Sequence, residues 1–282
     1  MSNLDRVLPR ARLTEIDHVE QREQDRPLPG DERLDERTPR LHARVGVPSS
    51  SEARVEGRQR RDGWRDVVDG LAGAVRMLGA LLTPFARPLR TTWGLSSADA
   101  ARAYPGDDLV PRPRWSWTHG IEIDAPAEEV WPWIAQIGAD RGGFYSYQWL
   151  ENLVGCEIRN AETVHPEWQL RAGDELRLHP RMPPLRVTRV DPGRWFVAFG
   201  APDDAARATD RPWTAGSWLF LVERIAGRRC RVISRFRAAC SDDLATRLQM
   251  GPTLLEPIGF AMDRRMLLGI KQRVERAPPR AS

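Results

Sequence analysis

The segment GGFYSYQWLEN, residues 142–152, concentrates side chains that can do chemistry. Two glycines are followed by four aromatic residues and then by Glu151 and Asn152. On a short helix, Tyr147 and Leu150 share one face with Glu151. A carboxylate on an otherwise apolar face is informative, because burying it without a partner costs free energy. Glu151 therefore either forms a structural ion pair with an arginine or points into a binding cavity, and both alternatives stay open here.

The same segment supplies further candidates for contact with a ligand. Tyr145 and Tyr147 each offer a ring for packing and a hydroxyl for one hydrogen bond, with a place in the core as the alternative. The preceding glycines allow a sharp turn that could aim these rings into a cavity. Asn152 adds an amide beside Glu151. If the protein transfers protons, Glu151, His165 and Tyr145 are the candidate catalytic residues, since each type can act as a general acid or base.

Residues farther along the chain complete the candidate ligand site. Met262 and Met266 share a face of an expected C-terminal helix, and methionine adapts to varied contacts, although a packed core explains them equally. Trp218 lies in an expected strand whose two faces are both apolar. Arg235 could pair with Glu151 or bind a carboxylate or phenolate of a ligand if it faces inward. Of the two orientations, we favour the one in which Arg235 faces outward and is exposed to solvent.

Motifs for metal, nucleotide or nucleophile chemistry are not found in the sequence. HExxH, GxGxxG after a strand, GxxxxGK[ST] and GxSxG are absent, and the five histidines are scattered. Cys156, Cys230 and Cys240 are widely spaced and form no CxxC pair. We therefore expect no metal and no cofactor, and reduced thiols in a cytoplasmic protein.

Charge argues against a nucleic-acid partner. The net charge is only +4, from 43 Lys and Arg against 39 Asp and Glu, and arginines alternate with acids along most of the chain. The densest basic runs, RQRRD at 58–62 and RRCR at 228–231, are interpreted as solvated surface. The first residues, MSNLDRVLPR, lack the apolar stretch of a secretory signal.

Composition divides the chain into segments. Residues 1–62 have few large apolar side chains and many charges, which predicts a disordered tail; an over-extended gene start is the alternative. Residues 91–114 are expected to be a connector, 115–277 the folded domain, and 278–282 a disordered C-terminus.

Residues 63–90 are expected to form an amphipathic apolar helix. Val67, Leu71, Val75 and Leu78 recur at helical spacing, and Pro84 should end the helix. Such a helix could lie on a membrane surface or on the domain itself, so peripheral membrane contact through residues 64–90, and with it membrane association, is an open alternative.

Residues 115–277 combine strand and helix patterns. A strand before Asp124 is followed by two short helices, around residues 127–137 and 146–154. Five short β-branched or aromatic segments come next: ELRLH, LRVTRV, RWFVAFG, SWLFLVER and CRVISRFRA. A long helix is expected over 251–276. Because the strands follow one another along the chain and the helices are separate from them, the pattern predicts an α+β fold with an antiparallel sheet. One sheet face should meet the long helix; the other could meet the helix of residues 64–90.

These motifs, in this order, resemble the SRPBCC or START-like superfamily, also called Bet v 1-like, and within it a bacterial subgroup described as polyketide cyclase-like. The resemblance covers about residues 91–276, and it rests on PGDDLVP (105–111), IEIDAPAEEVWPWIAQIG (121–138), RGGFYSYQWLENLVG (141–155), the PEWQ and AGDELRL pieces (166–178) and MDRRMLLGIKQRVE (262–275). It implies a helix-grip fold, in which a curved antiparallel sheet wraps around a long C-terminal helix. It also implies a cavity between them for an apolar or aromatic molecule.

Three functions are expected, in order. The first is binding of a hydrophobic or aromatic small molecule, such as a lipid, a quinone or a polyketide, because this needs only an apolar cavity with a few polar groups. The second is a cyclase- or hydrolase-like enzyme that uses the same cavity; it ranks lower because no nucleophile–base pair can be read from spacing. The third is a membrane-associated scaffold with a filled core.

Overall fold

The computed structural model describes residues 50–201, 208 and 211–276, of which 50–63, 65 and 66 are described by their backbone. The chain divides into two compact units, Met1–Pro48 and Ser49–Ser282, and every described residue belongs to the second. Disorder was expected for residues 1–62 and 278–282. Residues 1–49 and 278–282 lie outside the described residues, so for them it stays a prediction, whereas residues 50–62 are helical and the expectation is wrong there.

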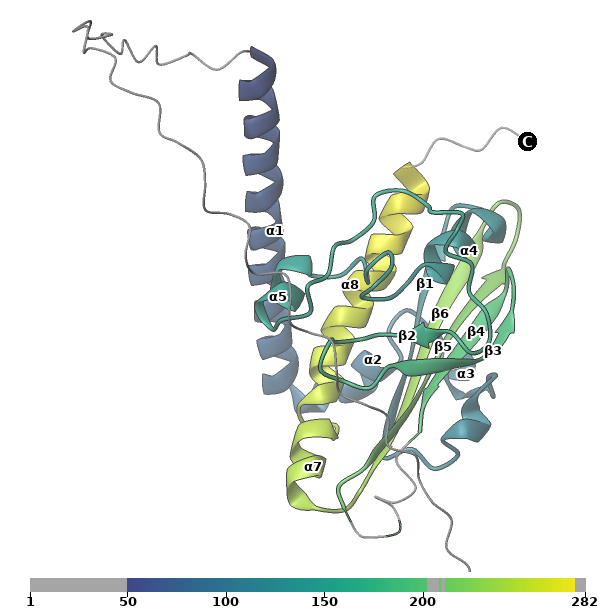
Figure 1. The fold of residues 1–282 in the computed structure, drawn as a ribbon. Coiled ribbons are helices and arrows are strands. Elements are labelled where there is room, and N and C mark those ends of the chain that lie inside the picture. Colours follow the sequence, from purple (N-terminus) through teal and green to yellow (C-terminus); the bar gives the residue numbers. More distant parts are fainter. Residues whose placement is uncertain (1–49, 202–207, 209–210, 277–282) are drawn as a thin grey trace, which may run out of the picture. The chain divides into compact units, whose positions relative to one another are not determined.

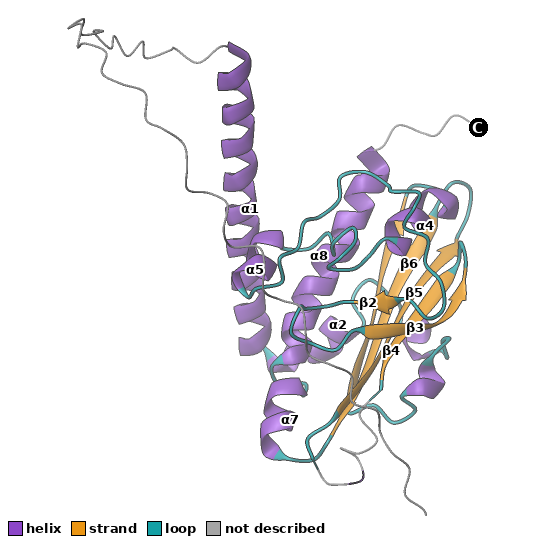
Figure 2. Ribbon diagram, viewed as in Figure 1, coloured by secondary structure: helices purple, strands orange, loops and turns teal. Residues whose placement is uncertain are grey.

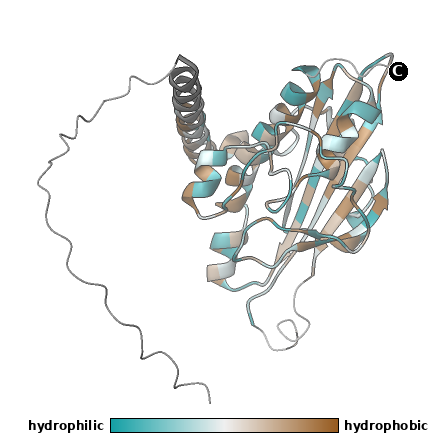
Figure 3. Ribbon diagram, turned by 45° about the horizontal axis from the view of Figure 1, so that its top comes forward, coloured by the Kyte–Doolittle hydropathy of each residue, from teal (hydrophilic) through white to brown (hydrophobic). Residues whose placement is uncertain are grey.

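The strands of the described residues form one antiparallel sheet of six strands in the order β1-β6-β5-β4-β3-β2 (Figures 1 and 2). β5 and β6 are the longest, and they pair along their whole length. The strands are β1 (Trp115–Ile123), β2 (Glu175–Leu176), β3 (Leu185–Asp191), β4 (Trp195–Gly200), β5 (Thr214–Arg224) and β6 (Cys230–Cys240). Hydrophilic and hydrophobic positions both occur in the sheet (Figure 3). Apolar and polar residues alternate along β3, whereas β4 and the centre of β5 are apolar on both faces, since successive side chains point to opposite faces and both faces are covered there.

Helices lie before, between and after the strands. Two short ones separate β1 from β2, as expected, and α8 crosses the sheet as the long C-terminal helix (Figure 2). The helices that follow β1 are α4 (Ala127–Ala135), α5 (Gln148–Leu153), α7 (Leu244–Met250) and α8 (Leu255–Arg276). This arrangement confirms the α+β helix-grip fold. The sequence pattern did not predict α7, a short helix whose Leu244 and Leu248 are exposed.

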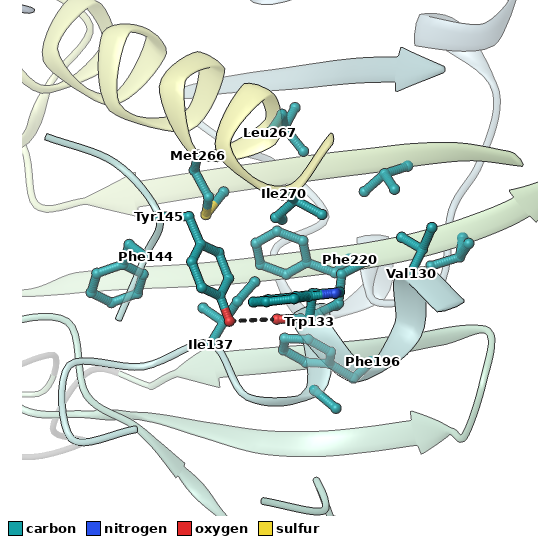
Figure 4. Close-up of a cluster of buried hydrophobic side chains, with 14 of the residues drawn as sticks. Val130, Trp133, Ile137, Phe144, Tyr145, Phe196, Phe220, Met266, Leu267 and Ile270 are labelled. Atoms are coloured by element: carbon teal, nitrogen blue, oxygen red, sulfur yellow. Dashed lines mark hydrogen bonds between the residues drawn. The ribbon is translucent and has the colours of Figure 1, made fainter. Parts of the chain in front are cut away.

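The main core lies between the sheet and α8. Phe196 and Phe220 stack with their ring centroids 5.3 Å apart on the inner face of the sheet. Met266 and Ile270 of α8 point toward these strands, and Tyr145 lies beside them (Figure 4). The alternating strand residues and the α8 stripe therefore meet as their two periods predict.

The outer face of the sheet is covered by the segment after α2 (Arg87–Thr91), not by the helix of residues 64–90. Leu95, Tyr104 and Leu109 pack there against Val197 and Ile233. The segment includes α3 (Ser97–Ala101) and the 3-10 helix η2 (Asp107–Leu109). The alternative in which residues 64–90 met the outer face is therefore wrong, because residues expected to be a simple connector already occupy it.

The N-terminal helix α1 (Ser50–Leu82) packs against α5 and α8. It starts farther toward the N-terminus than its apolar spacing predicts, and it ends before Pro84, where a proline ring blocks continuation. The 3-10 helix η1 (Pro84–Ala86) and α2 (Arg87–Thr91) then lead to the sheet.

Candidate functional site

Glu151, in the first turn of α5, is the most unusual group of the predicted site. Its side chain is buried, with 4% of the residue exposed, and neither carboxylate oxygen has a hydrogen-bond partner in the described part of the chain. Burial raises the pKa of Glu151 to about 7. The ion pair considered from the sequence is therefore not formed, and the raised pKa favours the protonated carboxyl more strongly than in an exposed glutamate.

Residues next to Glu151 hold the loop that follows α5. The amide of Asn152 donates to the Ile158 carbonyl at 2.9 Å and accepts from the Ile158 N–H at 2.6 Å. The backbone N–H of Cys156 donates to the Glu151 carbonyl oxygen at 3.1 Å. Burial, and then the Glu151 charge, raise the pKa of the Cys156 thiol. Asn152 is thus committed to a structural clamp, and Cys156 is an unactivated thiol beside Glu151.

Tyr145 is buried in the core, and its hydroxyl is fully used. The hydroxyl donates to the Trp133 carbonyl at 3.1 Å (Figure 4) and accepts from Gln136 Nε2 at 2.8 Å. Burial holds the pKa of Tyr145 well above its ordinary value. The same Gln136 accepts from the backbone N–H of His165 at 2.9 Å, which ties two predicted catalytic residues to one amide.

His165 itself lies at the surface. Its side chain is partly exposed, its ring lies 4.3 Å from that of Trp168, and Nδ1 is 3.2 Å from Glu167 Oε1. The hydroxyl of Tyr145 and the ring of His165 therefore have separate partners, which leaves Glu151 as the predicted catalytic residue with free polar atoms.

Tyr147 joins three helices. Its ring packs under Gly73 of α1, and its hydroxyl accepts from Arg76 Nη1 at 3.0 Å. The guanidinium of Arg265, on α8, lies 5.8 Å from the centre of the same ring. Met262 is half-buried one turn earlier on α8, and its carbonyl accepts from the Ser146 hydroxyl at 3.2 Å. Tyr147 thus acts as a packing residue between α1, α5 and α8.

Trp218 and Met266 both belong to the packed main core. The Trp218 indole Nε1 donates to Ser234 Oγ at 2.9 Å, so its polar edge is already satisfied. Met266 is almost fully buried on α8. Both side chains fill space between the sheet and α8, where the sequence predicted ligand contacts.

Arg235 lies on the other face of the sheet. Strand alternation places Ser234 toward α8 and Arg235 away from it. Arg235 is buried and donates to Asp107 at 2.7 and 3.1 Å, and to Thr118 Oγ1 at 2.5 Å. Arg235 faces outward, as expected, but it is not exposed, because η2 covers this part of the sheet. The pairing with Glu151 is wrong, because Arg235 points away from α8.

A buried polar network on the α8 side was missed by the sequence analysis. His119 Nδ1 lies 2.5 Å from Asp263 Oδ2, and its Nε2 lies 2.9 Å from the Arg90 carbonyl. Ser234 Oγ donates to Asp263 Oδ1 at 2.7 Å. The sequence held a signal for this network: Asp263 is a charged residue on the apolar face of the long helix, three positions before Met266. Each of these side-chain atoms of His119, Ser234 and Asp263 has a hydrogen-bond partner, which suits a structural role.

Comparisons with known proteins give remote structural neighbours. No protein-family model matches the chain, and no curated protein matches it. A conserved protein from Geobacillus kaustophilus is 11% identical with a TM-score of 0.32, over 57% of this chain and 95% of its own. The di-domain ARO/CYC protein BexL from the BE-7585A biosynthetic pathway is 17% identical with a TM-score of 0.29, over 57% of this chain and 46% of its own.

A third neighbour is a polyketide-cyclase-like protein from Corynebacterium glutamicum. It is 14% identical with a TM-score of 0.28, over 58% of this chain and 93% of its own. Because these TM-scores are all below 0.5, the fold assignment depends on the strand order and the helices of this chain itself.

Proposed function

We propose that the protein binds a hydrophobic small molecule that carries a hydroxyl or carbonyl group, with the Glu151 carboxyl as its polar contact. The observation that supports this is the buried Glu151 side chain with two unpartnered oxygens. Buried polar groups are nearly always hydrogen-bonded, so an unsatisfied carboxyl needs an explanation. A ligand that supplies the missing hydrogen bonds is a direct one.

The state of the carboxyl selects the ligand's chemistry. A protonated carboxyl donates one hydrogen bond and accepts others, so it complements a hydroxyl or a carbonyl group. A ligand anion is disfavoured, because it would meet a group that is partly ionised at neutral pH. The rest of the ligand is apolar, since Cys156 and Ile158, which follow α5 in the chain, belong to the buried apolar core. Alcohols of long chains, quinones and aromatic polyketides all fit this description.

A second candidate function is favoured by the same group. A general acid or base works best when its pKa lies near the operating pH, and that of Glu151 is about 7. Glu151 could therefore exchange a proton with a bound hydroxyl or carbonyl in a cyclase- or hydrolase-like reaction. If the wild type turns over a bound ligand and the Glu151→Gln variant does not, the protein is an enzyme and not only a binding protein.

Native mass spectrometry tests the binding proposal. The full chain is purified without detergent, and its mass is compared before and after solvent extraction. Oleyl alcohol, decylubiquinone and emodin are then added in turn as probes. We expect a co-purifying molecule or binding of at least one probe, with affinity roughly tenfold lower in Glu151→Leu.

The matched control is Glu157→Gln, which changes an exposed carboxylate a few residues farther along. It should leave binding unchanged. A wild-type protein that carries no ligand and takes up none of the three probes would contradict the proposal. So would a Glu151→Leu variant that gains stability and binds as the wild type does.

A further inference from the structure

The helix α1 has its apolar face turned outward. The side chains of Trp64, Leu71, Val75 and Leu82 are all largely exposed, and they recur at spacings of four and seven residues. Such spacings place them on one side of the helix. Val68 and Leu78 are exposed on the same side. Globular domains normally turn this face toward the core.

The opposite side of α1 is the one that packs on the domain. Gly70 lies against the Trp149 ring, where an added Cβ would come within 2.5 Å, and Gly73 lies against Tyr147 at 3.0 Å. Ala80 is buried on the same side. Small residues thus let α1 approach α5 closely, and they leave the large apolar residues outside.

The charged side chains of this region are held by the domain. Asp69 pairs with Arg265 at 2.7 Å, and Arg76 bonds to the Tyr147 hydroxyl at 3.0 Å. Arg87 pairs with Glu256 at 2.7 Å. In the described stretch from Val67 to Leu89, the outward face is therefore apolar, and its charges are engaged toward the protein.

The apolar surface continues past the end of α1. Phe85 is 83% exposed on η1, and Leu89 is 77% exposed on α2. No single helix in the described residues is long and apolar enough to cross a membrane; Val67–Leu82 and Pro84–Thr91 meet that criterion only together, with a bend of 94° between them. We call Trp64, Val68, Leu71, Val75, Leu78, Leu82, Phe85 and Leu89 the outer stripe.

We propose that the outer stripe docks the protein on the surface of a lipid bilayer, with its apolar side chains inserted among the lipid chains. An isolated apolar residue on a surface is ordinary, whereas a continuous row of large ones marks an interaction site. The row spans about 27 Å from Trp64 to Leu82 at the helical rise per residue. Trp64, at one end, is of the type that prefers the boundary between lipid and water.

Three features favour lipid over a protein partner. A specific protein interface carries about one hydrogen bond per 100–200 Å², and the outer stripe offers no charged group to direct one. The helix also presents only one side, because α5 and α8 cover the other. This geometry suits a helix that lies in the interface plane. Arg58, Arg60 and Arg61 precede the outer stripe in the sequence, and against Asp62 they leave residues 58–63 with a net positive charge, which suits a membrane surface.

The test is flotation of the full chain, purified without detergent, with vesicles of phosphatidylcholine alone and of phosphatidylcholine mixed with phosphatidylglycerol. The variant is the double substitution Phe85→Glu and Leu89→Glu. Both residues are exposed, so the change should not disturb packing. The matched control is Met182→Glu with Ile225→Glu, which are also exposed but lie outside the outer stripe.

We expect the wild type and the control to float with both vesicle types, also at high salt. The double variant should partition roughly tenfold less. Failure of the wild type to float, or equal flotation of the double variant, overturns the proposal. If the wild type binds only to the anionic vesicles and high salt abolishes this binding, the proposal is overturned, and surface charge explains the attraction instead.

Size-exclusion chromatography with light scattering on the same proteins identifies the remaining alternative. A wild-type dimer that does not float, and that the double variant turns into a monomer, would assign the outer stripe to a second copy of this chain and overturn the lipid proposal. The binding proposal for Glu151 stays separable, because the probe experiments contain no vesicles.

Discussion

At the scale of single residues, three buried acids differ in how well they are satisfied. Asp263 has a partner for each oxygen, and Glu256 has Arg87 for one oxygen only. Glu151 has none. Leaving a buried carboxyl unpaired costs free energy unless it is protonated or finds a ligand. Glu151 is therefore the acid whose environment is hardest to explain by folding alone.

Replacing Glu151 by Gln should alter the pH dependence of stability. The pKa of Glu151 is raised from 4.5 to about 7 on folding, so the folded state binds more protons than the unfolded state between these values. Stability contributed by this group therefore falls as pH rises from about 4.5 to 7, by up to about 3 kcal/mol. Glutamine stays neutral and should remove this loss.

Urea unfolding at pH 5 and pH 8 measures the effect. We expect Glu151→Gln to be more stable than the wild type at pH 8 and close to it at pH 5. Glu157→Gln, an exposed neighbour, should follow the wild type at both. An equal difference between Glu151→Gln and wild type at the two pH values would show that Glu151 does not titrate in this range.

At the scale of elements, the contact between α1 and α5 depends on two close approaches of glycine to aromatic rings. Gly73→Leu should displace α1, because its Cβ alone would come within 3.0 Å of the Tyr147 ring. Overpacking of this kind costs about 1–3 kcal/mol. The helix itself should not suffer, because leucine is a better helix former than glycine.

Gly79→Leu is the matched control, since a Cβ at Gly79 meets nothing within 4 Å and gains the same helix propensity. Limited proteolysis with trypsin distinguishes the two variants. We expect faster cleavage after Arg76 in Gly73→Leu, because its bond to Tyr147 is lost, and a wild-type rate in Gly79→Leu. Equal rates in both variants would show that α1 is not held through Gly73.

The longer elements were predictable from the sequence because local periodicity determines them, whereas the short α7 was not predicted. The β-branched and aromatic segments predicted the strands β5 and β6, and the apolar stripe predicted the long helix α8. That the sheet wraps around this helix was implied only by the family resemblance. The 3.6-residue spacing of α1 also predicted an apolar face. It did not predict which way that face points, since the direction depends on Gly70 and Gly73, which contact Trp149 and Tyr147.

The candidate site was less predictable, because its partners are far apart in the sequence. His119 and Asp263 are separated by 144 positions, and no local pattern pairs them. Arg235 could be assigned to a face only once α8 was known to contact Ser234 on the other. Tyr145 was expected to offer a hydroxyl for one hydrogen bond, but the partners of that hydroxyl, and of the Trp218 indole, are set by the tertiary fold.

At the scale of the whole sheet, two layers cover its two faces by different means. The inner face packs on α8 through the apolar main core. The outer face holds the segment of residues 95–110 through a smaller apolar cluster and through the buried Arg235, paired with Asp107. The outer layer should therefore depend on this ion pair more than the inner layer depends on any one contact.

Adjacent aspartates make that dependence measurable. Asp107→Asn leaves the buried Arg235 without its counterion, which should cost about 2–4 kcal/mol. Asp108→Asn removes an exposed pair with Arg189, at 2.6 Å, and should leave the urea midpoint close to that of the wild type, because water screens surface pairs. Hydrogen exchange should then show faster exchange at Tyr104, whose backbone N–H donates to Asp107, only in Asp107→Asn. If the two variants lose equal stability, the outer layer is held by its apolar cluster rather than by Arg235.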